Sequence, residues 1–103
     1  MIIIETPIFS RLIVTLMSDD EYRTLQEVLI QHPGLGAIIQ GTGGLRKLRW
    51  AQGGRGKRGG MRVIYYWQKN DEQLYMLYGY PKSEQQDLTV EQKKLLQQIV
   101  ERW

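Results

Sequence analysis

Glycine is concentrated in two segments near the middle of the chain, and this feature restricts the fold more than any other. Residues 33–44 and residues 52–60 hold five glycines each. Glycine disfavours the interior of a helix, because it loses more backbone freedom on folding than any other residue. Leu45–Ala51 lies between the two segments, and Met61–Trp67, which is rich in β-branched and aromatic residues, follows them. The centre is therefore expected to form strands joined by loops.

The N-terminal part carries the signals of two amphipathic helices. Thr6 is a good N-cap with proline at the first helical position, and apolar residues then recur at three- and four-residue spacing. Ser18 and Glu21 form a capping-box motif, in which each side chain can bond the other residue's backbone N–H. This second helix is expected to end at Pro33, where proline and glycine follow one another.

Two further strands and one helix complete the predicted order. Ile2–Glu5 is β-branched and short, and Leu74–Tyr78 follows a polar turn at residues 70–72. Thr89 and Gln92 form a second capping box, which opens the last helix. The sequence predicts an α+β fold of order β-α-α-β-β-β-α in a single domain of residues 1–103. Its sheet would be mostly antiparallel and flanked by helices.

Charge is divided sharply between the centre and the flanks. Between Val28 and Asn70 there is no Asp or Glu, so this stretch carries +8, whereas six basic and 11 acidic residues give the flanks −5. Crowded like charges repel one another, so such a block favours an anionic partner, with nucleic acid as the first candidate. A solvated hairpin tip remains the alternative for residues 52–60. The eight basic residues are Arg46, Lys47, Arg49, Arg55, Lys57, Arg58, Arg62 and Lys69.

Side-chain alternation predicts where some of these cations converge. Lys47 and Arg49 share a face of their strand, and Arg62 shares a face with Tyr66 on the next strand. Cations gathered on one sheet face are costly without an anion, and arginine binds a phosphodiester bidentately. The run at residues 65–67 is interpreted as core rather than as a platform for base stacking.

The remaining residue types limit the chemistry. His32 is the only histidine and sits at the expected end of a helix, which excludes a two-histidine ribonuclease mechanism. No group of acidic residues has metal-ligand spacing, so neither a metal nor another cofactor is expected. Cleavage of RNA would then use the ribose 2′-hydroxyl as nucleophile, with Arg and Lys stabilising the phosphate. The general base would be a lysine of lowered pKa or a tyrosine.

The compartment is indicated only indirectly. The chain has no cysteine, which excludes disulfides and thiolate metal sites and is simplest in a reducing cytoplasm. No apolar run approaches the ~20 residues of a membrane span, and the N-terminus does not read as a signal peptide. A cytoplasmic protein without a membrane partner is expected.

Several segments resemble HigB-type toxins of the RelE/ParE superfamily. The specific ones are Ile39–Arg49 and the glycine-lysine-arginine loop Gly56–Gly60, whereas the start of Arg62–Trp67 is shared across the superfamily. The likeness continues through Leu74–Tyr80 and Asp87–Thr89. It implies a small RelE-like fold and ribosome-dependent, metal-independent cleavage of mRNA. It also implies a cognate antitoxin, often a helix-turn-helix HigA-like protein, through which alone the toxin would reach operator DNA.

The resemblance also assigns roles to residues. Arg62 matches the strand arginine at the scissile phosphate, and Lys82 falls near an arginine position of RelE. The catalytic tyrosine of RelE aligns with about Leu88, and Tyr80 is the nearest candidate to replace it. The candidate catalytic residues are Arg62, Lys57, Lys82 and Tyr80, and the candidate contacts to RNA or the ribosome are Arg46, Lys47, Arg49, Arg55 and Arg58.

Two other functions remain open at this stage. ParE-like toxins share the fold but inhibit DNA gyrase, and the predicted convergence of Lys47, Arg49 and Arg62 favours RNA cleavage over that activity. A non-catalytic nucleic-acid-binding module would explain the basic block equally well. It would lose binding uniformly as arginines are removed, with a steep dependence on salt.

Overall fold

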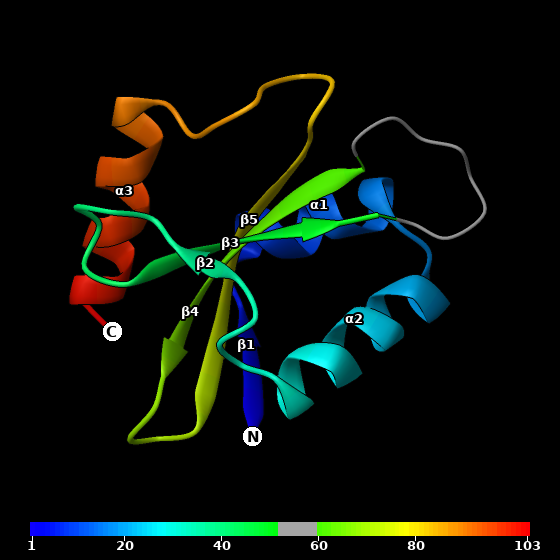
Figure 1. Ribbon diagram of the computed structural model, residues 1–103, viewed down its shortest axis with the longest axis horizontal. Coiled ribbons are helices and arrows are strands. Elements are labelled where there is room, and N and C mark those ends of the chain that lie inside the picture. The colour runs from blue at the N-terminus through cyan, green and yellow to red at the C-terminus, as the bar shows by residue number, and fades with distance from the viewer. Residues whose placement is uncertain (52–59) are drawn as a thin grey trace.

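A five-stranded sheet of order β1-β5-β4-β3-β2 forms the centre of the protein (Figure 1). The computed structural model describes residues 1–51 and 60–103. β1 pairs with β5 in parallel, and the other neighbouring strands are antiparallel. The elements are β1 (Ile2–Glu5), α1 (Pro7–Leu16), α2 (Asp19–Gln31), β2 (Ala37–Ile38), β3 (Leu45–Trp50), β4 (Met61–Gln68), β5 (Gln73–Pro81) and α3 (Val90–Glu101).

The predicted α+β class and its sheet are confirmed, with one strand more than expected. β2 lies in the first glycine-rich segment, where the sequence predicts only loop, so the order β-α-α-β-β-β-α lacks one strand. β2 is two residues long and edges the sheet beside β3. β5 also extends beyond its predicted end, through Pro81. Both differences arise where pairing with a neighbouring strand, rather than local propensity, sets the conformation.

The helix starts follow their predicted caps. The Thr6 hydroxyl accepts from the Phe9 amide at 3.1 Å and donates to the Leu77 carbonyl of β5 at 2.9 Å. Both capping boxes form, at Ser18 for α2 and at Thr89 for α3. None of the helices in the described ranges is long and apolar enough to cross a membrane.

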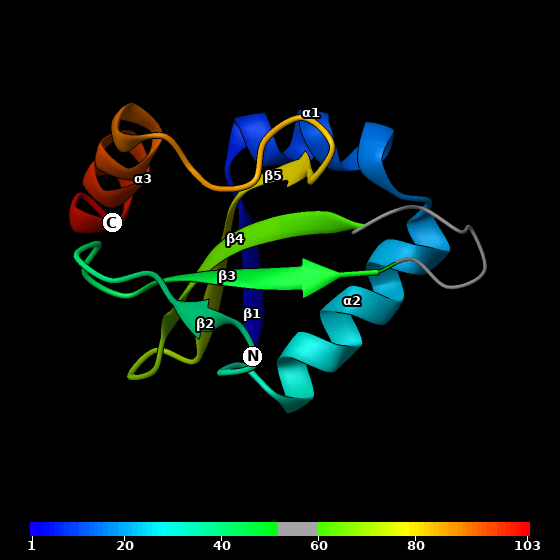
Figure 2. The same cartoon turned by 45° about the horizontal axis from the view of Figure 1, so that its top comes forward.

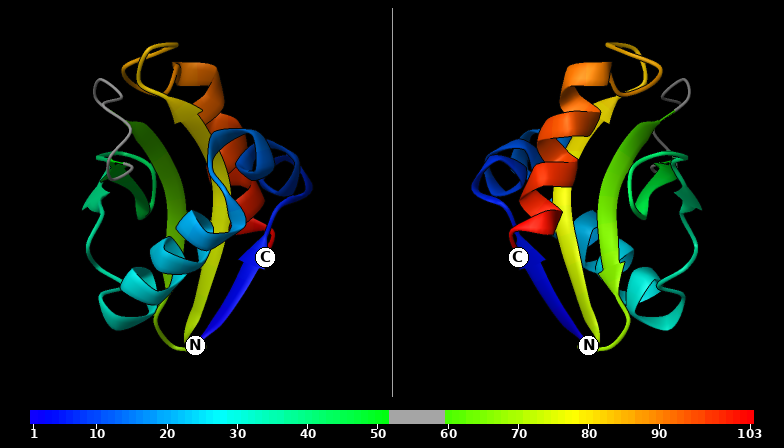
Figure 3. Two further views of the ribbon diagram at one scale, coloured as in Figure 1. Left: turned by 90° about the vertical axis from the view of Figure 1, so that its right-hand side faces the viewer. Right: turned by 90° about the vertical axis from the view of Figure 1, so that its left-hand side faces the viewer.

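Two hydrophobic clusters lie on the two faces of the sheet. The first joins α1 and α2, through residues such as Phe9 and Leu25, to Val63 and Tyr65 of β4. The second joins Leu96 of α3 to the other faces of β3, β4 and β5. Figures 2 and 3 show the helices arranged around the curved sheet, with α2 and α3 at opposite ends. Of the run at residues 65–67, which the sequence assigns to the core, Tyr65 is fully buried, whereas Tyr66 and Trp67 are half-buried against the two clusters.

The strand register fixes what the α3 side of the sheet presents. Arg49 of β3 lies opposite Arg62 of β4, and Arg62 lies opposite Tyr80 of β5. Two residues before Arg49 on the same face of β3, Lys47 lies opposite Ile64 of β4. α3 covers only part of this face, so the end of the sheet nearest residue 60 is left for polar side chains.

Candidate functional site

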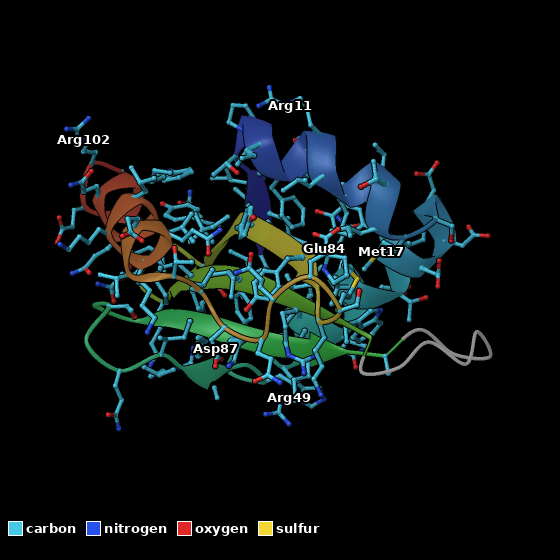
Figure 4. All side chains as sticks on the ribbon, turned by 90° about the horizontal axis from the view of Figure 1, so that it is seen from above. Arg11, Met17, Arg49, Glu84, Asp87 and Arg102 are labelled. Atoms are coloured by element: carbon cyan, nitrogen blue, oxygen red, sulfur yellow. The ribbon has the colours of Figure 1, made fainter. Side chains whose placement is uncertain are left out.

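A small hollow collects basic side chains from three separate parts of the chain. It has a volume of about 170 Å³, and we call it the cationic hollow. Strands β3 and β4 form one side of the hollow, and the connection from β5 to α3 forms the opposite side. Arg49 and Asp87 lie together on the β3 side of the molecule, whereas Arg11 lies across it on α1 (Figure 4). The residues that line the cationic hollow are Lys47, Arg49, Arg62, Lys82, Gln86 and Asp87.

The predicted convergence of three strand cations is therefore present in the fold. Lys47 and Arg49 are two positions apart on β3, and the antiparallel register carries Arg62 onto the same face. Lys82, directly after β5, joins them, and its backbone N–H donates to the Gly60 carbonyl at 3.2 Å. With four cations and one carboxylate, the described lining carries a formal charge of +3.

Arg62 is the cation most fixed by the fold. Only 5% of it is exposed, and one guanidinium nitrogen, Nη1, donates to the Met61 carbonyl at 3.3 Å. Arg49, by contrast, is exposed at the edge of the hollow. A buried guanidinium held on a strand can bind an anion without first losing much side-chain freedom. The hollow thus combines a buried cation, Arg62, with an exposed one, Arg49, at its rim.

Gln86 and Asp87 are the two lining residues that sequence reasoning did not identify, and Asp87 is the charged one. Its carboxylate accepts a hydrogen bond from Lys47 Nζ at 2.6 Å, which forms an ion pair across 40 positions of the chain. This hydrogen bond and the charge of Lys47 lower the pKa of Asp87. The sequence signal was present only as the resemblance at residues 87–89, which assigned no role to the carboxylate. Asp87 lowers the positive charge of the hollow and restrains Lys47.

Tyr80 lies behind the hollow rather than in its lining. It is 2% exposed, and its hydroxyl has no hydrogen-bond partner among the described residues. Burial raises the pKa of Tyr80, and the negative charge of Asp87 adds to the increase, while Arg62 opposes it. The phenol therefore remains protonated at neutral pH. As a neutral group it can donate a hydrogen bond or a proton, but it cannot act as the general base.

Arg46 lies on the opposite face of the sheet from these cations. Its Nη1 donates to the carbonyls of Gly34 and Gly36, at 3.2 and 2.8 Å. Its guanidinium carbon also lies 5.8 Å from the centre of the Trp67 ring, in a cation–π contact. The fold thus separates Arg46 from Lys47 and Arg49, and it gives Arg46 a contact that orders the segment before β2.

The other predicted site residues lie outside the described part of the chain. Arg55, Lys57 and Arg58 belong to residues 52–59, and their predicted contacts stay predictions. Across the described ranges, no three His, Cys, Asp or Glu side chains form a group that could hold a metal ion. The chemistry open to the hollow is the binding of an anion by arginine and lysine, with a carboxylate beside it.

One comparison with known proteins bears on this arrangement. Residues 31–103 match the model of the RelE family, described as the RelE toxin of the RelE/RelB toxin–antitoxin system. The matched region begins at the end of α2. It contains the strands β2 to β5, the helix α3 and every residue that lines the cationic hollow.

Proposed function

The chain belongs to the RelE toxin family, and from this premise we propose that it is a ribosome-dependent endoribonuclease that cleaves mRNA. It is the toxin of a toxin–antitoxin system, and its partner is an antitoxin. The observation that supports cleavage is the gathering of Lys47, Arg49, Arg62 and Lys82 around one hollow. This hollow has the charge that a scissile phosphate requires, because negative charge builds on the phosphate in the transition state.

In the proposed reaction, the ribose 2′-oxygen attacks the neighbouring phosphorus. A new 2′-O–P bond forms and the bond from phosphorus to the 5′-oxygen breaks, which leaves a cyclic phosphate and a 5′-hydroxyl. Arg62 and Arg49 bind the phosphate oxygens. The 2′-hydroxyl proton passes to a base in the hollow, for which the carboxylate of Asp87 is the candidate, while Lys82 adds positive charge beside the phosphate. Tyr80, which stays neutral, is the candidate donor to the leaving oxygen.

The antitoxin is proposed to be a helix-turn-helix protein of the HigA type, as the resemblance to HigB-type toxins implies. It would neutralise the toxin by covering the basic face or by keeping the toxin off the ribosome. Binding to operator DNA would occur only through the antitoxin. The cytoplasm, where ribosomes and mRNA meet, is the proposed compartment.

Cell-free translation tests the proposed activity directly. The purified protein should stop translation and cleave the message within its coding region, and it should leave supercoiling by DNA gyrase unchanged. Arg49→Ala is a suitable variant, because Arg49 is exposed and its loss should not disturb the fold. Arg11→Ala, an exposed arginine on α1, is the matched control. Intact messages together with inhibited supercoiling would show a gyrase inhibitor of the same fold.

Expression in bacteria provides an independent test. Without an antitoxin, the protein should stop growth, and Arg62→Ala should relieve the toxicity while the variant still folds and accumulates. Normal growth with abundant, folded wild-type protein would contradict the toxin's proposed action on translation.

A further inference from the structure

A second, larger hollow adjoins the cationic hollow along the outer edge of the sheet. It has a volume of about 570 Å³, and we call it the edge groove. Lys47 and Arg49 line both hollows, so the two are adjacent. Apart from these two cations, the lining residues that belong to the described ranges are all apolar: Leu35, Ala37, Ile38, Ile39 and Leu48.

Two large apolar side chains of the edge groove are exposed to solvent. Leu35 is 51% exposed and Ile38 is 56% exposed. Single exposed apolar residues need no explanation, but here two of them lie in one concave surface bordered by cations. A ligand that is flat and apolar at one end and anionic at the other would match such a surface.

The segment that carries Leu35 is held in place by specific hydrogen bonds. The Tyr65 hydroxyl accepts from the Gly36 amide at 2.8 Å and donates to the Pro33 carbonyl at 2.7 Å. Arg46 adds its two bonds to the carbonyls of Gly34 and Gly36. The exposure of Leu35 is therefore a property of an ordered segment, which can receive a ligand at a low cost in conformational entropy.

We propose that the edge groove binds the base of the RNA nucleotide next to the phosphate in the cationic hollow. This inference rests on the proposed ribonuclease function and adds a base-binding site to it. The shared cations Lys47 and Arg49 bind the phosphate, while Leu35 and Ile38 pack against the face of the base. Among the described residues no carboxylate lines the groove itself, and the nearest one, Asp87, lies on the other side of Lys47 in the cationic hollow. Contact through an apolar face tolerates any base, because every base has a flat π-face.

Nuclear magnetic resonance of the ¹⁵N-labelled protein separates the two parts of the proposed site. A nucleoside 5′-monophosphate should shift the backbone amides of Leu35, Ala37 and Ile38 as well as those of Lys47 and Arg49. Ribose 5-phosphate, which lacks the base, should shift only the amides around the cationic hollow. Equal shifts from both ligands, or no shift in the edge groove, would overturn the base-binding proposal.

A pair of variants tests the same claim by affinity. Leu35→Ser should weaken binding of the nucleoside monophosphate about fivefold and leave binding of ribose 5-phosphate unchanged, because only apolar contact with the base is lost. Val14→Ser, at a 70% exposed position on α1, is the matched control and should change neither affinity. Equal weakening of both ligands by Leu35→Ser, or no weakening of either, would contradict the proposal.

The two proposals fail in different ways. If ribose 5-phosphate binds at the cationic hollow and the base adds nothing, the edge groove is not a base site, and the ribonuclease proposal is untouched. If neither ligand shifts the amides of Lys47 and Arg49, the phosphate site itself is contradicted, and the base site is overturned with it. Shifts confined to the amides of Leu35, Ala37 and Ile38 would mean that the base binds without the phosphate, and they would also overturn the proposal.

Discussion

At the scale of single residues, Tyr80 has the most unusual environment in the site. The Tyr80 hydroxyl is buried opposite Arg62 and has no hydrogen-bond partner among the described residues. Burying an unsatisfied hydroxyl lowers the stability of the fold. We predict that Tyr80→Phe leaves the free energy of unfolding unchanged or raises it by about 1 kcal/mol. The same variant should cleave ribosome-bound mRNA at least about tenfold more slowly, because the donor is lost. Urea unfolding and a cleavage time course measure the two effects, and an unchanged cleavage rate would remove Tyr80 from the machinery.

Asp87 should oppose the binding of RNA through its ion pair with Lys47. Asp87→Asn raises the formal charge of the hollow from +3 to +4, so we predict RNA binding about two- to fivefold tighter at low salt, with a steeper salt dependence. Titration of a labelled oligonucleotide at several salt concentrations measures this, with Asp71→Asn, in the turn between β4 and β5, as the control. Weaker binding by Asp87→Asn would contradict this prediction, because it would mean that the contact of the carboxylate with the 2′-hydroxyl outweighs its repulsion of the phosphate.

The pH dependence of this effect has a definite sign. Because Lys47 lowers the pKa of Asp87, the ion pair is fully formed above the ordinary carboxyl pKa and is lost as the pH falls through the lowered one. The difference between wild type and Asp87→Asn should therefore be present at neutral pH. It should shrink only in acid, as wild-type Asp87 becomes protonated.

Alternation along a strand could have placed most of these cations from the sequence. Period two puts Lys47 and Arg49 on one face, and the same rule puts Arg46 on the other, where the structure has it. What the rule cannot supply is the partner of each side chain. The pairing of Lys47 with Asp87 spans 40 positions and depends on where the connection after β5 passes over the sheet.

At the scale of secondary-structure elements, the segment before β2 depends on close packing at one glycine. A Cβ at Gly36 would lie 2.8 Å from the Tyr65 ring and 3.2 Å from the backbone of Lys47, whereas at Gly34 the nearest atom would be 3.5 Å away. We predict that Gly36→Ala lowers the free energy of unfolding by about 1–3 kcal/mol and that Gly34→Ala changes it by much less. Urea unfolding of both variants measures this, and equal effects would contradict the packing argument.

β2 also shows why sequence reasoning missed one element. Its two residues are too few for any alternation to be read, and they lie among five glycines that favour loop. The helices were easier to predict, because the capping boxes at Ser18 and Thr89 are local signals that bond within four residues. The helices, whose starts are set by their own side chains, were predictable from the sequence. β2, which exists only through its pairing with β3, was not.

At the scale of the whole molecule, the fold converts a charge pattern along the chain into a site on one face. The acid-free stretch of residues 28–70 supplies Lys47, Arg49 and Arg62, and the antiparallel pairing of β3 with β4 brings them together. Lys82 and Asp87 come from the acidic C-terminal flank and complete the hollow. The sequence predicted the gathering of strand cations, whereas the composition of the opposite wall required the three-dimensional path of the chain.

The central claim is that the cationic hollow holds the phosphate that is cleaved. Single-turnover cleavage of mRNA on purified ribosomes tests it most directly, with ribosome affinity measured for the same proteins. Arg62→Ala should cleave about 10²–10³-fold more slowly and keep ribosome binding within about threefold of wild type, since it removes stabilisation of the transition state. Arg11→Ala should match wild type in both. Wild-type cleavage by Arg62→Ala, or a loss explained wholly by weaker ribosome binding, would contradict the account.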